Sequence, residues 1–245
     1  MLKPLIQFDY WGLPIYLIMA IIGFVFAFIL LSDKLTGINC TPAMKKSVQR
    51  SFLLGFAAAL LCAHFANWFL FPEILQYPLN QRIETGGFSF YYGMIGFFVV
   101  SALLLRLHKV NCVFWINEIV PSVVLFHAFG RVGCSLSGCC YGMEMVLFGV
   151  AFDFPAREIE ALTLFIMFLI FEKKVTERRF LWYLTCYSVL RFCLEFGRGD
   201  DRGVLLFSTL SPAQVTSIAI WIILAAYLTY NALKLIASRN PAKSR

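Results

Sequence analysis

The chain has 245 residues, of which 60% are hydrophobic and 14% are charged, and its formal net charge is +7. Soluble domains average roughly half apolar and about a quarter charged residues, so this composition excludes an ordinary soluble domain. The apolar residues form long uncharged runs instead of amphipathic patterns, which indicates that lipid is the solvent. We therefore expect an all-α integral membrane protein with a single domain over residues 1–245.

Seven apolar runs predict seven transmembrane helices. In chain order they cover residues 11–32, 51–72, 88–105, 110–130, 156–171, 180–196 and 211–233. Asp33 and Lys34 close the first run like a membrane boundary, so we expect a span there and not a cleaved signal peptide. The fourth, fifth and sixth runs carry ionisable residues, and such residues are costly enough inside a membrane to suggest a function.

The basic residues divide unequally between the two sides of the membrane. With the loops assigned to alternate sides, 14 of the 21 Lys and Arg residues lie on the side of the C-terminus and seven on the other. This is a positive-inside pattern, so we expect the N-terminus outside and the C-terminus in the cytoplasm. Because the positive charge follows the loops, it argues against a nucleic-acid partner. Six of the seven outer basic residues are arginine, which binds phosphate in a bidentate manner.

The sixth run carries four polar residues at helical spacing. Tyr187, Arg191, Glu195 and Arg198 follow one another at intervals of four, four and three, so they share one face of a helix. Glu195 can pair with both arginines. This face is either a structural ladder of ion pairs or a site in which one arginine is free to bind an anion.

Residues 127–142 are rich in glycine. The four glycines are Gly130, Gly133, Gly138 and Gly142. Glycine permits sharp turns and close approach to a ligand, and irregular backbone at membrane depth is tolerated only inside the protein or beside a wet cavity. We expect a turn that presents Arg131 to a phosphate head group, with Cys134, Cys139 and Cys140 in the same stretch.

Two further segments supply candidates. Tyr91 and Gly93 lie at the start of the third run, where an aromatic belt at the membrane interface is the alternative reading. After Pro155, Glu158 is expected to stabilise a helix N-terminus. Glu160 lies further along the helix and is the better candidate for a buried acid.

Several motifs, in the same order along the chain, resemble those of the prolipoprotein diacylglyceryl transferases of bacterial membranes. The Gly-Arg-x-Gly-Asn signature of that family corresponds to residues 130–134, and its Tyr-x-x-x-Arg-Phe-x-x-Glu-x-x-Arg helix corresponds to residues 187–198. Its Gly-Gly-x-Ser-Phe-His-Gly-Gly-Leu-Ile-Gly segment corresponds to residues 86–96. Shorter matches lie at residues 10–13, 155–160 and 210–214.

The resemblance implies a fold, an activity and partners. Members of the family have seven spans with an outer N-terminus, and they move a diacylglyceryl group from phosphatidylglycerol to a cysteine thiol of a secreted preprotein. We therefore expect a monomeric, thioether-forming transferase of the bacterial cytoplasmic (inner) membrane, which acts on phosphatidylglycerol and a lipobox cysteine in lipoprotein biosynthesis. Neither an organic cofactor nor a metal ion is expected.

The resemblance also implies roles for individual residues. Arg131 and Arg191 are the expected phosphate ligands, Glu195 orients Arg191, and Tyr91 stands where the family has His. The expected substrate-binding residues are Gly93, Gly130, Gly133, Cys134, Cys139, Glu160, Tyr187 and Arg198.

The cysteines depart from the family pattern, because Cys134 and Cys139 replace an Asn and a Glu. They could form a disulfide brace on an oxidising outer face, or one of them could take the lipid group transiently as a nucleophile. With Cys140 they could also bind a metal, although no fourth Cys or His lies at ligand spacing. His127 could act as a base, but an interhelical hydrogen bond is the preferred reading.

Three other functions fit the same pattern. The first is a lipid transferase of the same fold with a different acceptor. The second is a non-catalytic phospholipid-binding membrane protein. The third is a thiol oxidoreductase, which is disfavoured because the sequence contains no Cys-x-x-Cys motif.

Overall fold

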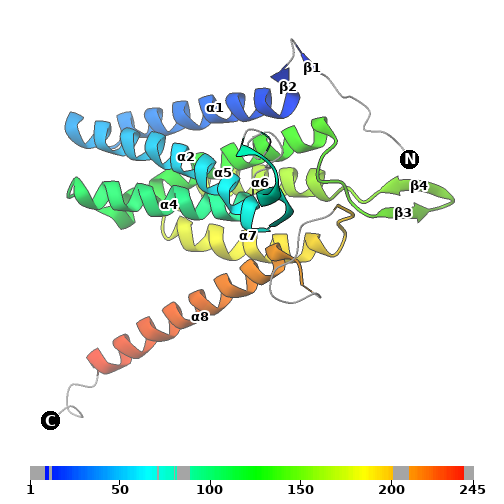
Figure 1. The fold of residues 1–245 in the computed structure, drawn as a ribbon. Coiled ribbons are helices and arrows are strands. Elements are labelled where there is room, and N and C mark those ends of the chain that lie inside the picture. Colours follow the sequence, from blue (N-terminus) through cyan, green and yellow to red (C-terminus); the bar gives the residue numbers. More distant parts are fainter. Residues whose placement is uncertain are drawn as a thin grey trace.

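The computed structural model describes residues 9–10, 13–70, 72–79, 81, 89–200 and 210–239. Its long helices, shown in Figure 1, are α1 (Ile15–Gly37), α2 (Pro42–Leu70), α4 (Phe90–Leu107), α5 (Cys112–Ser137), α6 (Ala156–Lys173), α7 (Arg179–Glu195) and α8 (Pro212–Arg239). The short elements are the strands β1 (Asp9–Tyr10), β2 (Leu13–Pro14), β3 (Glu144–Leu147) and β4 (Val150–Asp153) and the 3-10 helix η1 (Pro72–Gln76). Within the segments named above, residues 11–12, 71 and 86–88 lie outside the described part of the chain, as do three of the seven basic residues assigned to the outer side, Lys3, Arg82 and Arg202.

Each predicted span coincides with one long helix, which confirms an all-α membrane protein. Five of these helices, α1, α2, α4, α5 and α8, are long and apolar enough to cross a membrane. The helices α6 and α7 have 18 and 17 residues, and both carry charged side chains. Their length is at the lower limit for a span, so the count of seven spans remains a prediction.

The bundle is apolar on the outside and polar within. Large hydrophobic side chains such as Ile29 and Leu61 are more than half exposed. His127, Arg131 and Glu160 are buried. This distribution of side chains is the reverse of that in a soluble protein and suits a lipid solvent. Apolar side chains are compatible with contact to lipid, whereas polar groups must find partners inside the protein.

Helix α5 lies at the centre of the bundle and contacts α1, α4, α6 and α7. Helix α2 packs along α4, and α8 packs against α7 before it diverges from the other helices (Figure 1). Trp115 and Ile119 on α5 are buried among these helices. Side chains from four helices can therefore meet α5 near one point of its length.

The predicted turn at Gly130 and Gly133 is wrong, because α5 continues through both glycines and through Arg131 to Ser137. A Cβ atom at Gly133 would come within 3.1 Å of the Met19 Cβ atom on α1. Glycine therefore serves the close packing of two helices here, as small residues do at many membrane-helix interfaces. The chain turns only at Gly138, whose φ of 71° lies in the left-handed region that ends many helices.

A β-hairpin that the sequence did not predict follows α5. Glu144–Leu147 pairs antiparallel with Val150–Asp153. Phe148 and Gly149 connect the strands with φ of 52° and 78°, the two positive values that a tight hairpin turn requires. The hairpin projects from the end of the bundle at which α5 ends and α6 begins (Figure 1).

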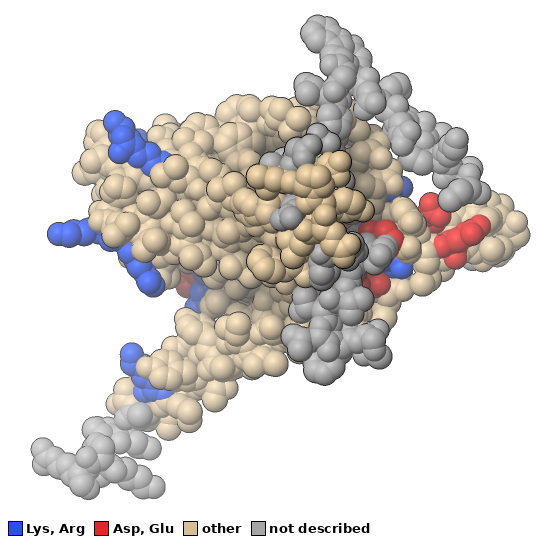
Figure 2. Space-filling view, viewed as in Figure 1, with Lys and Arg blue, Asp and Glu red and all other residues tan. Residues whose placement is uncertain are grey.

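Charged side chains gather at the two ends of the molecule. In Figure 2, Lys and Arg side chains lie at the end where α1 and α4 finish, acidic side chains lie toward the hairpin end, and the surface between them carries almost no charge. At the first end, Lys34 Nζ lies 2.5 Å from Glu172 Oε1, and Arg179 Nη1 lies 2.7 Å from Glu118 Oε1. These two ion pairs connect α1 to α6 and α5 to α7.

Replacing Arg179 by Met should lower the thermal stability of the purified protein. Arg179 is only 5% exposed and also donates to the carbonyl oxygens of Phe171 and Val175. Its loss leaves a poorly compensated carboxylate at Glu118, at a cost of about 3 kcal/mol. Thermal unfolding in detergent measures the effect, with Lys46→Met as the control because Lys46 is exposed at the same end. Equal melting temperatures for the two variants would contradict this account.

Candidate functional site

The carboxylate of Glu160 on α6 is the centre of a buried polar cluster. Its side chain is fully buried. Arg131 Nε on α5 lies 3.0 Å from Glu160 Oε1, and the Tyr187 hydroxyl on α7 donates to the same oxygen at 3.0 Å. Three helices are therefore joined at one atom. The other oxygen, Oε2, has no hydrogen-bond partner among the described residues.

Arg191 lies beside this cluster and is 3% exposed. Its Nη2 atom lies 2.6 Å from Glu195 Oε2, so the predicted pairing of these two residues is confirmed. Arg191 is also within electrostatic range of Glu160 and Arg131. Its Nη1 atom is buried and has no hydrogen-bond partner in the described part of the chain. A guanidinium group with an unused buried donor is a suitable ligand for an anion.

The predicted pairing of Glu195 with Arg198 is wrong. Helix α7 ends at Glu195, so Arg198 lies in the following turn and not on the helical face. Arg198 instead makes a bidentate pair with Asp200, in which Nε and Nη2 donate to the two carboxylate oxygens at 2.9 and 3.1 Å. Burial raises the pKa of the Asp200 carboxyl, and Arg198 opposes this shift. The Nη1 atom of Arg198 is buried without a partner among the described residues.

Tyr91 and Gly93 both lie near the start of α4. The Tyr91 hydroxyl is 2.8 Å from Ser217 Oγ on α8, and its ring centroid is 5.6 Å from that of Tyr187. Tyr91 therefore joins α4 to α8 at the edge of the Glu160 cluster. Gly93 lies against α2, where a Cβ atom would meet the Ala63 Cβ atom at 3.1 Å. Gly93 thus serves helix packing, whereas a Cβ atom at Gly130 would meet no atom within 4 Å.

His127 lies one helical turn before Arg131 on α5 and is 2% exposed. Its Nδ1 atom is 3.1 Å from the Tyr183 hydroxyl on α7, which is the interhelical hydrogen bond that the sequence favoured. Its ring stacks on Phe90 with centroids 3.5 Å apart. The Nε2 atom lies 3.9 Å from Glu160 Oε1 and has no hydrogen-bond partner among the described residues.

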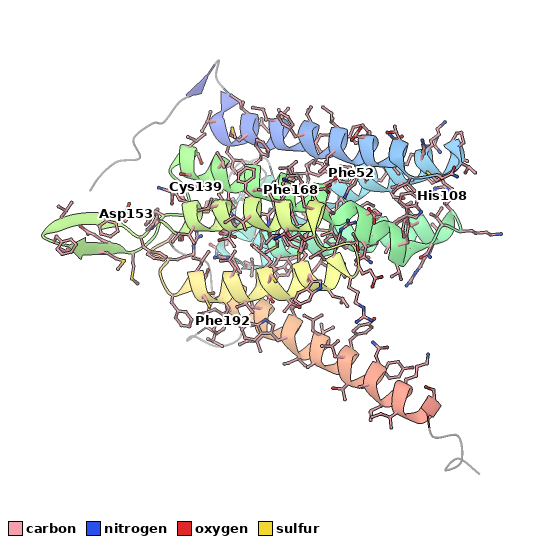
Figure 3. All side chains as sticks on the ribbon, turned by 180° about the vertical axis from the view of Figure 1, so that it is seen from behind. Phe52, His108, Cys139, Asp153, Phe168 and Phe192 are labelled. Atoms are coloured by element: carbon pink, nitrogen blue, oxygen red, sulfur yellow. The ribbon has the colours of Figure 1, made fainter. Side chains whose placement is uncertain are left out.

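Three thiols lie together at the C-terminal end of α5. The sulfur atoms of Cys134, Cys139 and Cys140 all lie within 4.8 Å of one another, and all three residues are free cysteines. Figure 3 places Cys139 toward the hairpin end of the bundle, far from His108. Hydrogen bonds from the other two thiols, aided by Arg131 and Arg198, lower the pKa of Cys140.

Tyr183 and Ser217 were not among the predicted site residues. Tyr183 precedes Tyr187 by four positions, so it extends the same polar face of α7 by one turn, and that spacing could have revealed it. Ser217 lies in an uncharged apolar run, where a single serine carries no comparable signal. Its contact with Tyr91 depends on two helices that are far apart in the sequence.

Comparison with known proteins shows the family of the chain. The model of the prolipoprotein diacylglyceryl transferase family matches residues 4–230, which is nearly the whole chain. The chain belongs to this family. It is 32% identical over 181 residues to phosphatidylglycerol–prolipoprotein diacylglyceryl transferase 2 of Clostridium perfringens, covering 66% of this chain and 69% of that protein.

Two further relatives match over most of their length. The phosphatidylglycerol–prolipoprotein diacylglyceryl transferase of Clostridium tetani is 30% identical over 240 residues, covering 89% of this chain and 93% of its own. The protein of the same name from Aeromonas hydrophila is 28% identical, with 89% of this chain and 86% of its own covered. The Glu160 cluster and the thiols at the end of α5 both lie within the residues that match the family.

Replacing Glu160 by Gln should destabilise the protein strongly. Glutamine keeps the shape of the side chain but removes the charge, so Arg131 becomes a buried cation without a counter-ion, at a cost of about 3 kcal/mol. Thermal unfolding in detergent measures the change. The control is Glu158→Gln on the same helix, because the Glu158 side chain is 43% exposed and should matter less. The account fails if Glu160→Gln melts at the temperature of the unaltered protein.

Proposed function

We propose that this protein transfers the diacylglyceryl group of phosphatidylglycerol to the cysteine thiol of a secreted preprotein in the bacterial cytoplasmic membrane. Its family and the names of its relatives support this activity. The observation that carries the site assignment is the buried guanidinium group of Arg191, which lies within electrostatic range of Arg131 and has a donor atom, Nη1, without a partner among the described residues. Such donors fit the phosphate oxygens of a lipid head group.

The proposal includes seven spans, an outer N-terminus and a cytoplasmic C-terminus. The division of 14 and seven basic residues supports this orientation. With it, the hairpin end of the bundle faces outward, and the Glu160 cluster lies below that surface. The lipid would then reach the cluster from the membrane, while the preprotein would reach it from the outer face.

The reaction moves negative charge from sulfur to phosphate. The acceptor thiolate attacks the glycerol carbon that bears the phosphate, a carbon–sulfur bond forms, and the carbon–oxygen bond breaks. The electron pair of that bond leaves with the oxygen, so glycerol phosphate departs with one more negative charge than the lipid phosphate carried. Fixed donors aimed at this oxygen stabilise the transition state more than the bound lipid.

We assign these donors to Arg131 and Arg191. Arg191 offers its unpaired Nη1 atom, and Glu195 holds the other side of its guanidinium group. Glu160 on α6 holds Arg131 in place, and Tyr187 on α7 donates to the same carboxylate oxygen. Because these donors are already oriented before the lipid binds, little reorganisation is needed when charge develops.

Tyr91 has a supporting role in this proposal. A phenol with a reference pKa near 10 is a poor base at neutral pH. Its hydroxyl is a good hydrogen-bond donor, and it lies at the boundary of α4, α7 and α8 beside Tyr187. We assign to it the orientation of the head group. Gly130, with open space where a side chain would be, leaves room for that group next to Arg131.

Purified protein incubated with phosphatidylglycerol and a lipobox peptide should produce a peptide that carries diacylglyceryl in thioether linkage, together with glycerol phosphate. Mass spectrometry of the peptide and the lipids detects both products. A peptide with Ser in place of the lipobox Cys is the control and should remain unmodified. Consumption of phosphatidylglycerol without a thioether product would contradict the assigned acceptor, and no consumption would contradict the transferase assignment.

Replacing Arg191 by Lys should reduce kcat by roughly 100-fold or more. Lysine keeps the charge but lacks the planar fork, so it cannot hold Glu195 and a phosphate oxygen together. The matched control is Arg178→Lys, because Arg178 lies exposed just before the first residue of the same helix. Steady-state assays of both variants make the comparison, and unchanged turnover in Arg191→Lys would refute the phosphate assignment.

A further inference from the structure

The three clustered thiols of Cys134, Cys139 and Cys140 take no part in the transfer reaction described above. Cys134 lies in the last turn of α5, and the other two follow the helix-ending Gly138. Cys140 has a left-handed φ of 61°, an uncommon conformation for a residue with a side chain. The chain therefore folds back on itself so that three sulfur atoms lie within 4.8 Å of one another.

We propose that these three thiolates bind one soft monovalent metal ion of the Cu(I) type. A metal–sulfur bond of about 2.3 Å in a trigonal arrangement places the sulfur atoms about 4 Å apart, which the cluster can reach with small side-chain movements. A disulfide would use two of the sulfur atoms and leave the third, whereas a trigonal ion uses all three. Thiolate ligands select Cu(I) and zinc among the common ions.

The absence of a fourth donor favours the monovalent ion. Zinc in structural sites is almost always held by four ligands, and the described residues place no other Cys, His or carboxylate in this group. A three-coordinate site suits Cu(I) better. This geometry changes the expectation from sequence, in which the missing fourth ligand counted against any metal.

Arginine side chains lie around the three thiols and favour their thiolate form. Three thiolates and one monovalent cation carry a net charge of −2. Arg131 and Arg198 both lie within electrostatic range of Cys140, and Arg157 Nη1 donates to the backbone carbonyl of Cys139 at 2.9 Å. Each thiol releases a proton when the ion binds. Each of these arginines also pairs with a carboxylate, so they offset only part of the remaining negative charge, and the exposure of Cys139 lets solvent screen the rest.

A bound ion would fix the turn that positions Arg198. The segment after the thiols is joined to the end of α7, since Gly199 N donates to Tyr141 O at 3.2 Å and Met143 N donates to Gly197 O at 2.8 Å. Gly142 and Arg198 also form an isolated β-bridge. The ion would therefore brace the outer end of α5 and, through this bridge, the backbone that carries Arg198.

The test is an anaerobic titration of the detergent-purified protein with Cu(I) against a chromophoric Cu(I) chelator. We expect one equivalent to bind at least 100-fold more tightly than to the variant with all three cysteines changed to Ser. X-ray absorption should find three sulfur neighbours at about 2.3 Å. The matched control changes Cys186 and Cys193 to Ser, because both are exposed and isolated on α7, and it should bind as tightly as the unaltered protein.

Three results would overturn the proposal. They are equal Cu(I) affinity in the unaltered protein and the triple variant, a disulfide among the three cysteines in protein purified without oxidant, and tighter binding of Zn(II) than of Cu(I). If the triple variant does not fold, Cys140→Ser alone should still lower the Cu(I) affinity at least tenfold. Because the readout is binding, the result is independent of the transferase assay.

Discussion

The buried carboxylate of Glu160 is the constraint on which the rest of the site depends. A charged group in a lipid-embedded bundle is tolerated only when charge and hydrogen bonds compensate it. Arg131 supplies the charge and Tyr187 the hydrogen bond, so α5, α6 and α7 must meet at the level of this one oxygen atom. The positions of Arg191 and His127 follow, because they lie on the same helices one turn from these contacts.

This arrangement explains how two short and charged helices belong in a membrane protein. The helices α6 and α7 carry acidic and basic residues that would be costly against lipid. In the bundle, Glu160 and Arg191 face inward and are buried, while the exposed positions of α6 are taken by residues such as Leu162 and Ile166. The cost of their polar residues is thus offset by pairing within the protein, and the apolar outer surface remains continuous.

The hairpin end of the bundle differs in character from its centre. Around Glu160 the charged groups form ion pairs within the bundle, whereas the end of α5 gathers three sulfur atoms with a β-hairpin beside them. The family pattern has an Asn and a Glu where this chain has Cys134 and Cys139. In the proposed site, other groups must therefore make the polar contacts with the head group, and Arg191 and Arg198 have unused donor atoms among the described residues.

The sequence by itself determined the class of the protein and singled out several residues of the buried polar cluster. Long apolar runs and the division of basic residues reflect the solvent, and solvent preference is a local property of each segment. The shared face of Tyr187, Arg191 and Glu195 follows in the same way from helical periodicity. Only the tertiary structure decided that Glu160 pairs with Arg131, that Tyr91 meets Ser217, and that Arg198 pairs with Asp200 and not with Glu195. These contacts depend on where one helix ends and which helix packs beside it. Gly133 illustrates why the sequence is ambiguous, because glycine suits both a turn and a close contact between helices. The neighbouring helix α1 selects the close contact.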